Sequence, residues 1–257
     1  MVRSKWQKRN GLWDYAIVQK GNNVPGKFEG KILVPFAVES SLSGVQKRVG
    51  DNNELWYHRT FTVPASWKNK KIILNFGAVD WKADVWVNDI KVGTHQGGYT
   101  PFNFDITPFL SKGKSQKLVV KVWDPTDNGF QPRGKQVNKP NGIWYTPVTG
   151  IWQTVWLEPV EQVYISHIKT IPNIDGNNIS VLAATQGNVS NDINAVKVLE
   201  KGQEISSGIA GAGTDVLVSG HEVKLWSGAS TFLYDMEVNV LQNGFDGDQI
   251  DSTCVLK

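Results

Sequence analysis

Cysteine is almost absent from this chain: Cys254 is the only one among 257 residues, so no disulfide can form within the chain. This scarcity is typical of a cytoplasmic protein, or of a periplasmic or secreted one that relies on its core. The first eleven residues, MVRSKWQKRNG, lack the apolar centre of a signal peptide, so a periplasmic or secreted protein requires that a leader has been removed. The compartment therefore stays unknown.

Long apolar runs and metal-binding patterns are missing as well. Nothing approaches the roughly 18 consecutive apolar residues of a membrane helix, so we expect no membrane partner. The four histidines stand apart from one another and from any cysteine pair, which excludes the common zinc patterns. Residues 246–251, DGDQID, space oxygen atoms as a calcium loop does but lack the other positions of an EF-hand, so we expect a hairpin turn there. We expect no metal in the site and no cofactor, and the presence of a structural metal stays open.

A basic stripe of the kind that binds nucleic acid is also missing. Residues 1–160 carry 22 Lys and Arg against 12 Asp and Glu, a net +10, whereas residues 161–257 carry 5 against 12, a net −7. The basic residues of the first part are scattered singly. Their densest group, Lys68, Lys70 and Lys71, precedes an apolar strand, where charge discourages unwanted strand pairing. We therefore expect no nucleic-acid partner.

What the chain does contain is a succession of short β patterns, with no amphipathic helix of useful length. Segments rich in β-branched and aromatic residues indicate strands at 55–63, 71–76, 82–88, 118–124 and 151–158. Pro, Gly, Asn and Asp gather between them, which is typical of all-β sandwiches. Asn88-Asp89 predicts a two-residue hairpin, because both residues tolerate positive φ.

The composition changes after Pro159 and Val160. Ten of the eleven tryptophans precede this point, and the later part is richer in Ala, Ser, Gly and Asn. The 97 residues from Glu161 to Lys257 match the usual size of an immunoglobulin-like sandwich, about 100 residues. We therefore expect two domains, residues 1–160 and residues 161–257.

Several segments resemble a known family. Residues 74–106, with WYHRTFTVP (56–64) before them and GIWYTPVTGIWQTVWLEPV (142–160) after them, resemble the N-terminal sugar-binding domain of glycoside hydrolase family 2, above all its β-galactosidase-like members. Residues 223–240 resemble a strand-turn-strand of the family's second domain. The resemblance implies a galactose-binding-like jelly-roll β-sandwich followed by an immunoglobulin-like β-sandwich. We expect the latter to be truncated at its C-terminal end, because the family continues there into a catalytic barrel.

Enzymes of this family are retaining glycosidases that hydrolyse O-glycosidic bonds in carbohydrate metabolism. The resemblance implies that both catalytic carboxyls, about 5 Å apart, come from the barrel. A barrel takes about 250 residues, and the two sandwiches already use the chain. We therefore expect no catalytic residue and an inactive portion that supports the barrel's active site. The Asn53-Glu54 pair, similar to the family's asparagine followed by its acid/base, is interpreted as a turn with too little burial for a general acid.

The resemblance also implies that loops of the first domain reach the mouth of the barrel and help to close the sugar pocket. Residues 35–41 and the long segment 124–147 occupy matching places in the chain, and long loops in compact domains are usually functional or disordered. The candidate substrate-binding residues, which offer hydrogen bonds and stacking planes, are Glu39, Arg133, Lys135, Gln136, Asn141, Trp144 and Tyr145. An interface with other domains of the same protein explains these loops equally well.

Other aromatic residues are assigned to structure. Tyr99, in the loop 97–101, is expected to pack over the sheet edge in a glycine-enabled turn. Tryptophans within predicted strands are expected in the core or between sheets, namely Trp56, Trp86, Trp123, Trp152 and Trp156. Trp144, beside the long segment, is the aromatic residue to test for sugar stacking.

Three functions stay open. The first is the N-terminal, non-catalytic portion of a β-galactosidase-like enzyme. Its partners would be carbohydrate, bound weakly or only with the full-length enzyme, the barrel of the same protein and, in a homo-oligomer, a second copy. The second is a stand-alone carbohydrate-binding module, and the third is a structural unit without a ligand. The glycone, the linkage and the oligomeric state stay open too.

Overall fold

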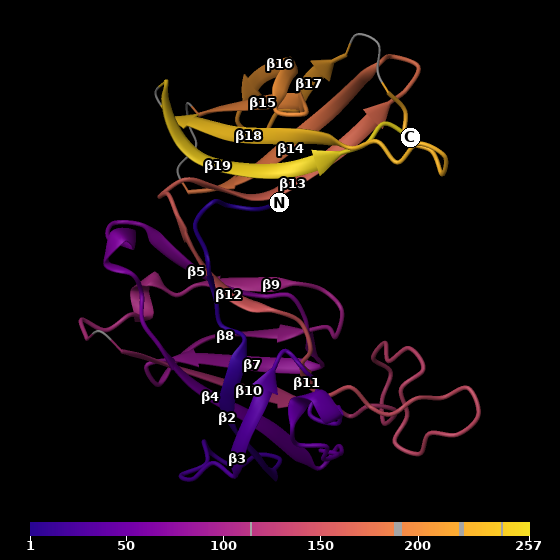
Figure 1. Ribbon diagram of the computed structural model, residues 1–257. Helices are drawn as coiled ribbons and strands as arrows, with labels where there is room; N and C mark the ends of the chain where they lie inside the picture. Colours follow the sequence, from indigo (N-terminus) through magenta and orange to yellow (C-terminus); the bar gives the residue numbers. More distant parts are fainter. Residues whose placement is uncertain (114, 188–191, 221–223, 243) are drawn as a thin grey trace. The chain divides into compact units, whose positions relative to one another are not determined.

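The structure is a computed structural model that describes residues 1–113, 115–187, 192–220, 224–242 and 244–257. Val223, the first residue of the segment that resembles the family's second domain, lies outside these ranges. The chain divides into two compact units, one formed by residues 6–159 and the other by residues 1–5 with 160–257 (Figure 1). The helices of the described residues are three single turns of 3-10 helix, η1 (Ser41–Ser43), η2 (Ala65–Trp67) and η3 (Thr107–Phe109). The predicted all-β fold is confirmed.

The first unit is a jelly-roll-type sandwich of two main sheets. The six-stranded sheet, antiparallel throughout, has the order β3-β2-β4-β10-β7-β8, the four-stranded sheet has the order β1-β12-β5-β9, and β6 pairs with β11. The strands are β1 (Gln7–Lys8), β2 (Gly11–Gln19), β3 (Gly30–Val34), β4 (Asn53–Phe61), β5 (Lys71–Phe76), β6 (Val79–Asp80), β7 (Lys82–Val87), β8 (Ile90–Gln96), β9 (Phe102–Asp105), β10 (Gln116–Trp123), β11 (Gly150–Ile151) and β12 (Val155–Val160).

The core of the first unit lies between its two main sheets. Leu118, Val120 and Val122 of β10 reach it from one sheet, and Leu74 and Phe76 of β5 reach it from the other; all five are buried. Side chains alternate along a strand. The intervening residues of β10 therefore point to the outer face of the six-stranded sheet.

The tight turn between β7 and β8 is the one predicted at Asn88-Asp89. The φ angles of these residues are +50° and +65°, as a two-residue hairpin needs. The Asn88 side chain also fastens the turn, because its Nδ2 donates to the carbonyl of Phe109 at 2.8 Å and its Oδ1 accepts from the amide of Lys117 at 2.9 Å. This prediction is confirmed.

The second unit is an immunoglobulin-like sandwich with its own core. Its sheets have the orders β13-β14-β17 and β16-β15-β18-β19. The strands are β13 (Tyr164–Asn173), β14 (Asn178–Gln186), β15 (Ile193–Glu200), β16 (Gln203–Gly211), β17 (Val216–Ser219), β18 (Tyr234–Gln242) and β19 (Phe245–Cys254). Val181 from one sheet, and Val196, Val238 and Ile250 from the other, are fully buried in this core.

The first five residues belong to the second unit, although the sequence boundary assigns them to the first domain. The backbone of Val2 exchanges hydrogen bonds of 2.7 and 2.8 Å with that of Asp251. The Nε and Nη2 atoms of Arg3 donate to the two carboxylate oxygens of Asp248 at 3.0 and 2.7 Å. Both side chains are buried. The N-terminal segment is therefore an integral part of this sandwich.

The hairpin turn expected at residues 246–251 is wrong, because these residues belong to β19. The turn lies before them, where Gln242 pairs with Phe245. Asp248 is 5% exposed, and its carboxylate is neutralised by Arg3. The acidic residues at 246–251 suggested a solvated turn, because no local pattern in the sequence indicates that Arg3 is the partner of Asp248.

Candidate functional site

Three connections of the first unit meet around a group of buried carboxyl side chains. They are the β3–β4 connection (residues 35–52), the β8–β9 connection (97–101) and the β10–β11 connection (124–149), which contains the long segment 124–147. Thr149 joins two of them, because its amide donates to Glu39 Oε2 at 2.9 Å and its Oγ1 donates to Asp124 Oδ2 at 2.8 Å. Asp80, in β6, lies against the β8–β9 connection at Gly98. Glu39, Asp80 and Asp124 are called the carboxyl cluster below.

The β8–β9 connection reaches Asp80 because its turn contains two glycines. Gly97 has a φ of +140°, which side chains disfavour. A Cβ atom on Gly98 would lie 2.6 Å from Asp80 Oδ1, closer than side chains approach. The Trp152 indole donates to the carbonyl of Gly98 at 2.7 Å, and the Tyr99 ring packs edge-on against Trp152 with centroids 6.3 Å apart. The predicted glycine turn is present, and it also brings the chain against a carboxyl group.

Burial raises the pKa values of the whole carboxyl cluster. It raises the pKa of Glu39 to about 7, against the lowering effect of the Thr149 amide. It raises the pKa of Asp80 to about 7 as well, and the negative charge of Asp124 adds to this rise. Burial also raises the pKa of Asp124, although Thr126 and Thr149 donate hydrogen bonds to it. Near neutral pH, Glu39 and Asp80 therefore bind more protons than ordinary carboxyls do.

Gln136 ties the long segment to the carboxyl cluster. Its Oε1 accepts from the amide of Val148 at 2.8 Å. Its side chain also hydrogen-bonds to Asp80, which lowers the pKa of that carboxyl. Its Nε2 lies 3.5 Å from the Tyr99 hydroxyl. One amide group thus links the segment, the β8–β9 connection and the cluster.

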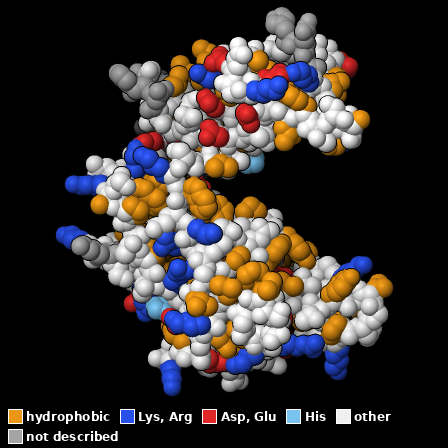
Figure 2. Space-filling model, in the orientation of Figure 1, with side chains coloured by type: hydrophobic (Ala, Val, Ile, Leu, Met, Phe, Trp, Pro, Cys, Tyr) orange, Lys and Arg blue, Asp and Glu red, His pale blue; other side chains and the backbone are white. Residues whose placement is uncertain are grey.

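The middle of the long segment extends away from the sheets (Figure 1). Trp144 is 39% exposed and Tyr145 is 65% exposed. The Arg133 guanidinium lies 5.7 Å from the centroid of the Trp144 ring. The carbonyls of Lys135 and Asn141 accept from the amides of Tyr145 and Trp144 at 2.8 and 3.0 Å. Figure 2 shows hydrophobic side chains gathered on this segment, together with basic ones.

The structure therefore separates the seven candidate residues. Glu39 and Gln136 belong to the network of the carboxyl cluster, and the other five lie on the outer part of the long segment. Sequence reasoning missed Asp80 and Asp124 as members of the site. A signal for Asp80 existed, because an acid inside the apolar run GAVDW predicts a buried carboxyl. It also missed Phe130, which is fully exposed on the segment.

The turn assigned to Asn53-Glu54 is wrong, because both residues lie in β4. Glu54 is 5% exposed, and its Oε1 lies 3.4 Å from the Nζ of Lys121 in the neighbouring strand. Strand pairing on both sides of β4 buries this carboxylate. We still predict that Glu54 has no catalytic role. The reason is now its ion pair with Lys121, and no longer the exposure expected of a turn residue.

The assignment of five strand tryptophans to the core or to packing between sheets holds for the burial of Trp56, which is 2% exposed, and is wrong for the other four. None of the five belongs to the core cluster, and all but Trp56 are partly exposed. Trp56, Trp86 and Trp123 alternate with core residues and lie on the outer face of the six-stranded sheet. There the Trp56 and Trp86 rings stack with centroids 5.6 Å apart. Alternation predicts two faces of a strand but not which one is internal when both carry aromatic residues.

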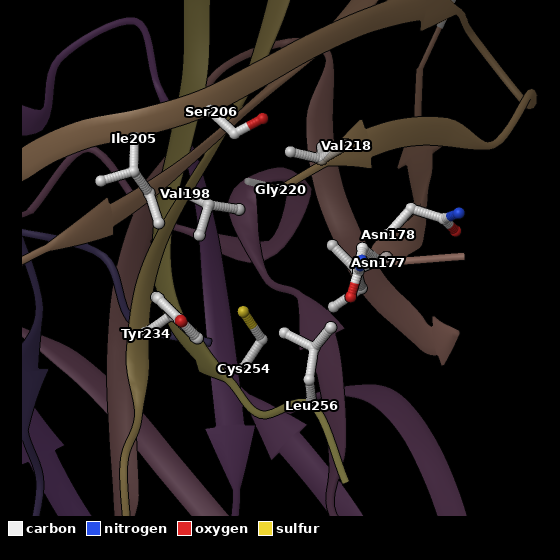
Figure 3. Close-up of a pocket in the computed structure, with 11 residues that line it drawn as sticks. Asn177, Asn178, Val198, Ile205, Ser206, Val218, Gly220, Tyr234, Cys254 and Leu256 are labelled. Carbon is white, nitrogen blue, oxygen red and sulfur yellow. The ribbon is translucent and has the colours of Figure 1, made fainter. Parts of the chain in front are cut away.

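The second unit contains a small cavity (Figure 3). Its volume is about 20 Å³, room for about one water molecule. The Cys254 sulfur points into the space beside Val198 and Leu256 (Figure 3), and burial raises the pKa of this thiol to about 11. A cavity of this size cannot hold a sugar ring.

No group of three or more His, Cys, Asp or Glu side chains among the described residues is arranged to hold a metal ion. Hydrogen-bond donors face the carboxyl cluster instead, from Thr126, Gln136 and Thr149. Over the same described ranges, no helix has the length and apolar character needed to cross a membrane.

Comparison with known proteins identifies relatives of the chain. The sequence profile described as "Glycosyl hydrolases family 2, sugar binding domain" matches residues 45–158. A β-glucuronidase of Paenibacillus borealis is 25% identical over 257 aligned residues, which cover 91% of this chain and 42% of that enzyme. A β-galactosidase of Thermoanaerobacter pseudethanolicus is 30% identical over 145 residues, which cover 56% of this chain and 19% of that enzyme.

Solved structures show the same fold. The crystal structure of Ruminococcus gnavus β-glucuronidase superimposes with a TM-score of 0.78 at 19% identity, covering 100% of this chain and 46% of that one. A Lactobacillus rhamnosus β-glucuronidase gives 0.78 at 22% identity and 45% of its length. This chain spans less than half the length of the relatives described. Residues 45–158 match the sugar-binding domain of glycoside hydrolase family 2, and the chain is similar to the N-terminal region of that family's glycosidases.

Proposed function

We propose that this chain supports the active site of a family 2 glycosidase without supplying the catalytic carboxylates. In this role the loops of its first unit complete the sugar pocket of a catalytic barrel in the same protein. The observation that carries the proposal is the meeting of three connections at the carboxyl cluster, where Gln136 and Thr149 fasten the long segment. The named relatives act on β-galactosides or β-glucuronides, so the proposed glycone is one of these two.

The carboxyl cluster is suited to positioning and unsuited to hydrolysis. A retaining glycosidase needs one carboxyl on each side of the scissile bond, both within reach of the substrate. Asp80 and Asp124 are only 4% and 3% exposed, and hydrogen bonds from the β10–β11 connection hold both carboxyls, from Gln136 to Asp80 and from Thr126 and Thr149 to Asp124. The cluster therefore sets the place and direction in which the long segment leaves the sandwich.

Sugar contacts would come from the outer part of the segment. Trp144 offers a stacking plane, Arg133 packs beside it, and Tyr145 offers a hydroxyl group. One loop leaves the other face of a sugar in water, whereas ligand sites normally bury most of the ligand. Each neutral hydrogen bond contributes about 1 kcal/mol, against several kcal/mol of association entropy. The isolated chain should bind simple sugars no better than about millimolar.

Replacing Trp144 with alanine should abolish this weak binding, because it removes the stacking plane. The measurement is a titration of the chain with galactose, glucuronic acid and lactose, followed by amide NMR shifts. Trp6→Ala, which removes a tryptophan that is 51% exposed outside the segment, is the matched control and should leave binding unchanged. Micromolar binding that survives Trp144→Ala would favour the stand-alone carbohydrate-binding module, with its site elsewhere.

The isolated chain should not hydrolyse aryl β-galactosides or aryl β-glucuronides, because in this proposal both catalytic carboxylates belong to the barrel. Misplacing a single catalytic carboxylate by 1 Å can already lower the rate about a hundredfold. A colorimetric assay at several pH values measures this. Turnover above background that is lost in Glu39→Gln would make the carboxyl cluster itself the catalytic centre and contradict the proposal. Reading the coding sequence beyond Lys257 gives an independent test, since the proposal requires an in-frame barrel in the parent protein.

A further inference from the structure

The outer face of the six-stranded sheet carries a pocket that the proposed function does not use. Strand register places Trp123 of β10 opposite Lys82 of β7, and Lys121 opposite Asp84. Lys121 and Trp123 alternate with core residues of β10, so they share the outer face. The pocket has a volume of about 120 Å³ and is lined by Lys20, Glu54, Lys82, Asp84, Lys121 and Trp123. None of these residues belongs to the carboxyl cluster.

The floor of the pocket is formed by Lys121 and two buried carboxylates, those of Asp84 and Glu54. The carboxylate of Glu54 has room for a further hydrogen bond. The Nζ of Lys121 lies 3.1 Å from Asp84 and 3.4 Å from Glu54, and both carboxylates are almost fully buried. Asp84 also accepts from Lys91 at 2.7 Å and from Thr94 at 2.5 Å. Glu54 has only long contacts, to Lys121 and to the amide of Gly21 at 3.4 Å. Charge-assisted bonds normally measure about 2.7–2.9 Å, so Glu54 can accept from a further donor.

The rim of the pocket carries two lysine ammonium groups that are not paired with a carboxylate among the described residues. Lys20 and Lys82 both line it, and in the part of the chain that the structure describes neither ammonium has a carboxylate partner. The Nζ of Lys20 lies 3.4 Å from the centroid of the Trp123 ring, an attraction that holds a cation in place. The Trp123 indole is itself held, because its Nε1 donates to the carbonyl of Asp51 at 2.7 Å. The rim therefore presents preorganised cations to solvent.

A ligand for this pocket must satisfy both parts of it. An anionic group suits Lys20 and Lys82, but a bare anion would be repelled by Glu54. A ligand that also carries hydroxyl groups can donate to Glu54 and remove this conflict. The volume of about 120 Å³ has room for several water molecules, and so for one carboxylate with one or two hydroxyl groups. We propose that this outer-face pocket binds a hydroxylated carboxylate, the chemistry presented by a uronic acid residue or an open-chain sugar acid.

The test is a titration of the whole chain with sodium glucuronate, sodium gluconate, glucose and sodium sulfate, observed by NMR of the tryptophan indole groups. The Trp123 signal, assigned with the Trp123→Phe variant, reports the pocket directly. Glucuronate or gluconate should shift it, with glucose and sulfate at least roughly tenfold weaker, a difference of about 1.4 kcal/mol. Tighter binding of glucuronate assigns the pocket to a sugar ring, and equal binding of gluconate extends it to open-chain acids. Sulfate that binds as well as glucuronate overturns the proposal.

Variants locate the ligand and separate this proposal from the proposed function. Lys20→Ala and Lys82→Ala should each weaken glucuronate binding roughly tenfold, the loss of one charge-assisted contact. Lys8→Ala, which removes an exposed lysine in β1, is the matched control and should have no effect. Melting curves confirm that each variant is folded. The proposal is refuted if Lys20→Ala and Lys82→Ala bind glucuronate as tightly as the parent chain while Trp144→Ala loses this binding. In that case the sugar acid binds to the long segment.

Discussion

Replacing Asp248 with alanine should destabilise the second unit by about 3–5 kcal/mol, the usual cost of leaving one partner of a buried ion pair uncompensated. Arg3 and Asp248 are 8% and 5% exposed. Besides binding Arg3 through both oxygens, Asp248 accepts from the amide of Ile165 at 2.8 Å, and Arg3 donates to the carbonyl of Ile165 at 2.6 Å. The substitution leaves a buried guanidinium and a buried amide without this acceptor. Because domains are stable by about 5–15 kcal/mol, much of the unit's stability would be lost.

Urea unfolding measures the free energy of unfolding of each variant. Hydrogen exchange of peptides from β13 to β19 reports the second unit separately from the first. Asp251→Ala, an exposed acid in the same strand, is the control and should change stability by less than about 0.5 kcal/mol. Deletion of residues 1–5 should reproduce the Asp248→Ala effect. The double replacement Arg3→Met with Asp248→Leu should recover part of it, because apolar pairs often substitute for buried ion pairs. A loss below about 1 kcal/mol in Asp248→Ala would refute an energetic role for this pair.

The first unit should lose stability as the pH rises from about 4 to about 7. Burial raises the pKa of Glu39 from 4.5 to about 7 and that of Asp80 from 3.8 to about 7. Between these limits the folded state binds more protons than the unfolded state, so the free energy of unfolding falls with rising pH. The contribution is fully present below pH 4 and lost above pH 7. At about 1.4 kcal/mol per pKa unit, Glu39 alone corresponds to about 3 kcal/mol.

Glu39→Gln and Asp80→Asn should flatten this dependence, because neither side chain titrates. Unfolding midpoints between pH 4 and pH 8, compared with those of the parent chain, isolate the two groups from others. This comparison is needed because burial lowers the pKa of His95, which acts in the opposite direction over the same range. Asp89→Asn, at an exposed acid in the β7–β8 turn, serves as the control. A parent curve that is flat, or that rises between pH 5 and pH 7 and is unchanged in both variants, would contradict the prediction.

Local patterns were sufficient for the elements themselves. Alternation and turn residues predicted an all-β chain and the hairpin at Asn88-Asp89, because strand faces and positive φ angles depend on neighbouring residues. The family resemblance was also a local signal, carried mainly by residues 56–160. The candidate loops could be chosen from their length and composition, since a long polar segment between two strands is visible without a structure.

Which loops meet was decided only by the tertiary structure. Asp80 lies in β6, whereas Glu39, Gly98 and Thr149 lie in three different connections. No sequence spacing indicates that these four residues meet. In the carboxyl cluster, the raised pKa values arise from burial and from the charges of neighbouring carboxyls. Burial of this kind is a property of packed neighbours, so the carboxyls that hold the long segment in place were the least visible in the sequence.

The sequence by itself determined the strands and the tight turn, because these depend on contacts between near neighbours along the chain. The tertiary structure decided which face of each strand is internal, so it moved Trp123 to an outer pocket and buried Glu54 in a strand. It also decided the partner of Asp248, which is 245 residues away at Arg3. Ion pairing and burial depend on which residues lie close together in the folded chain, and the order of residues in the sequence does not give these distances.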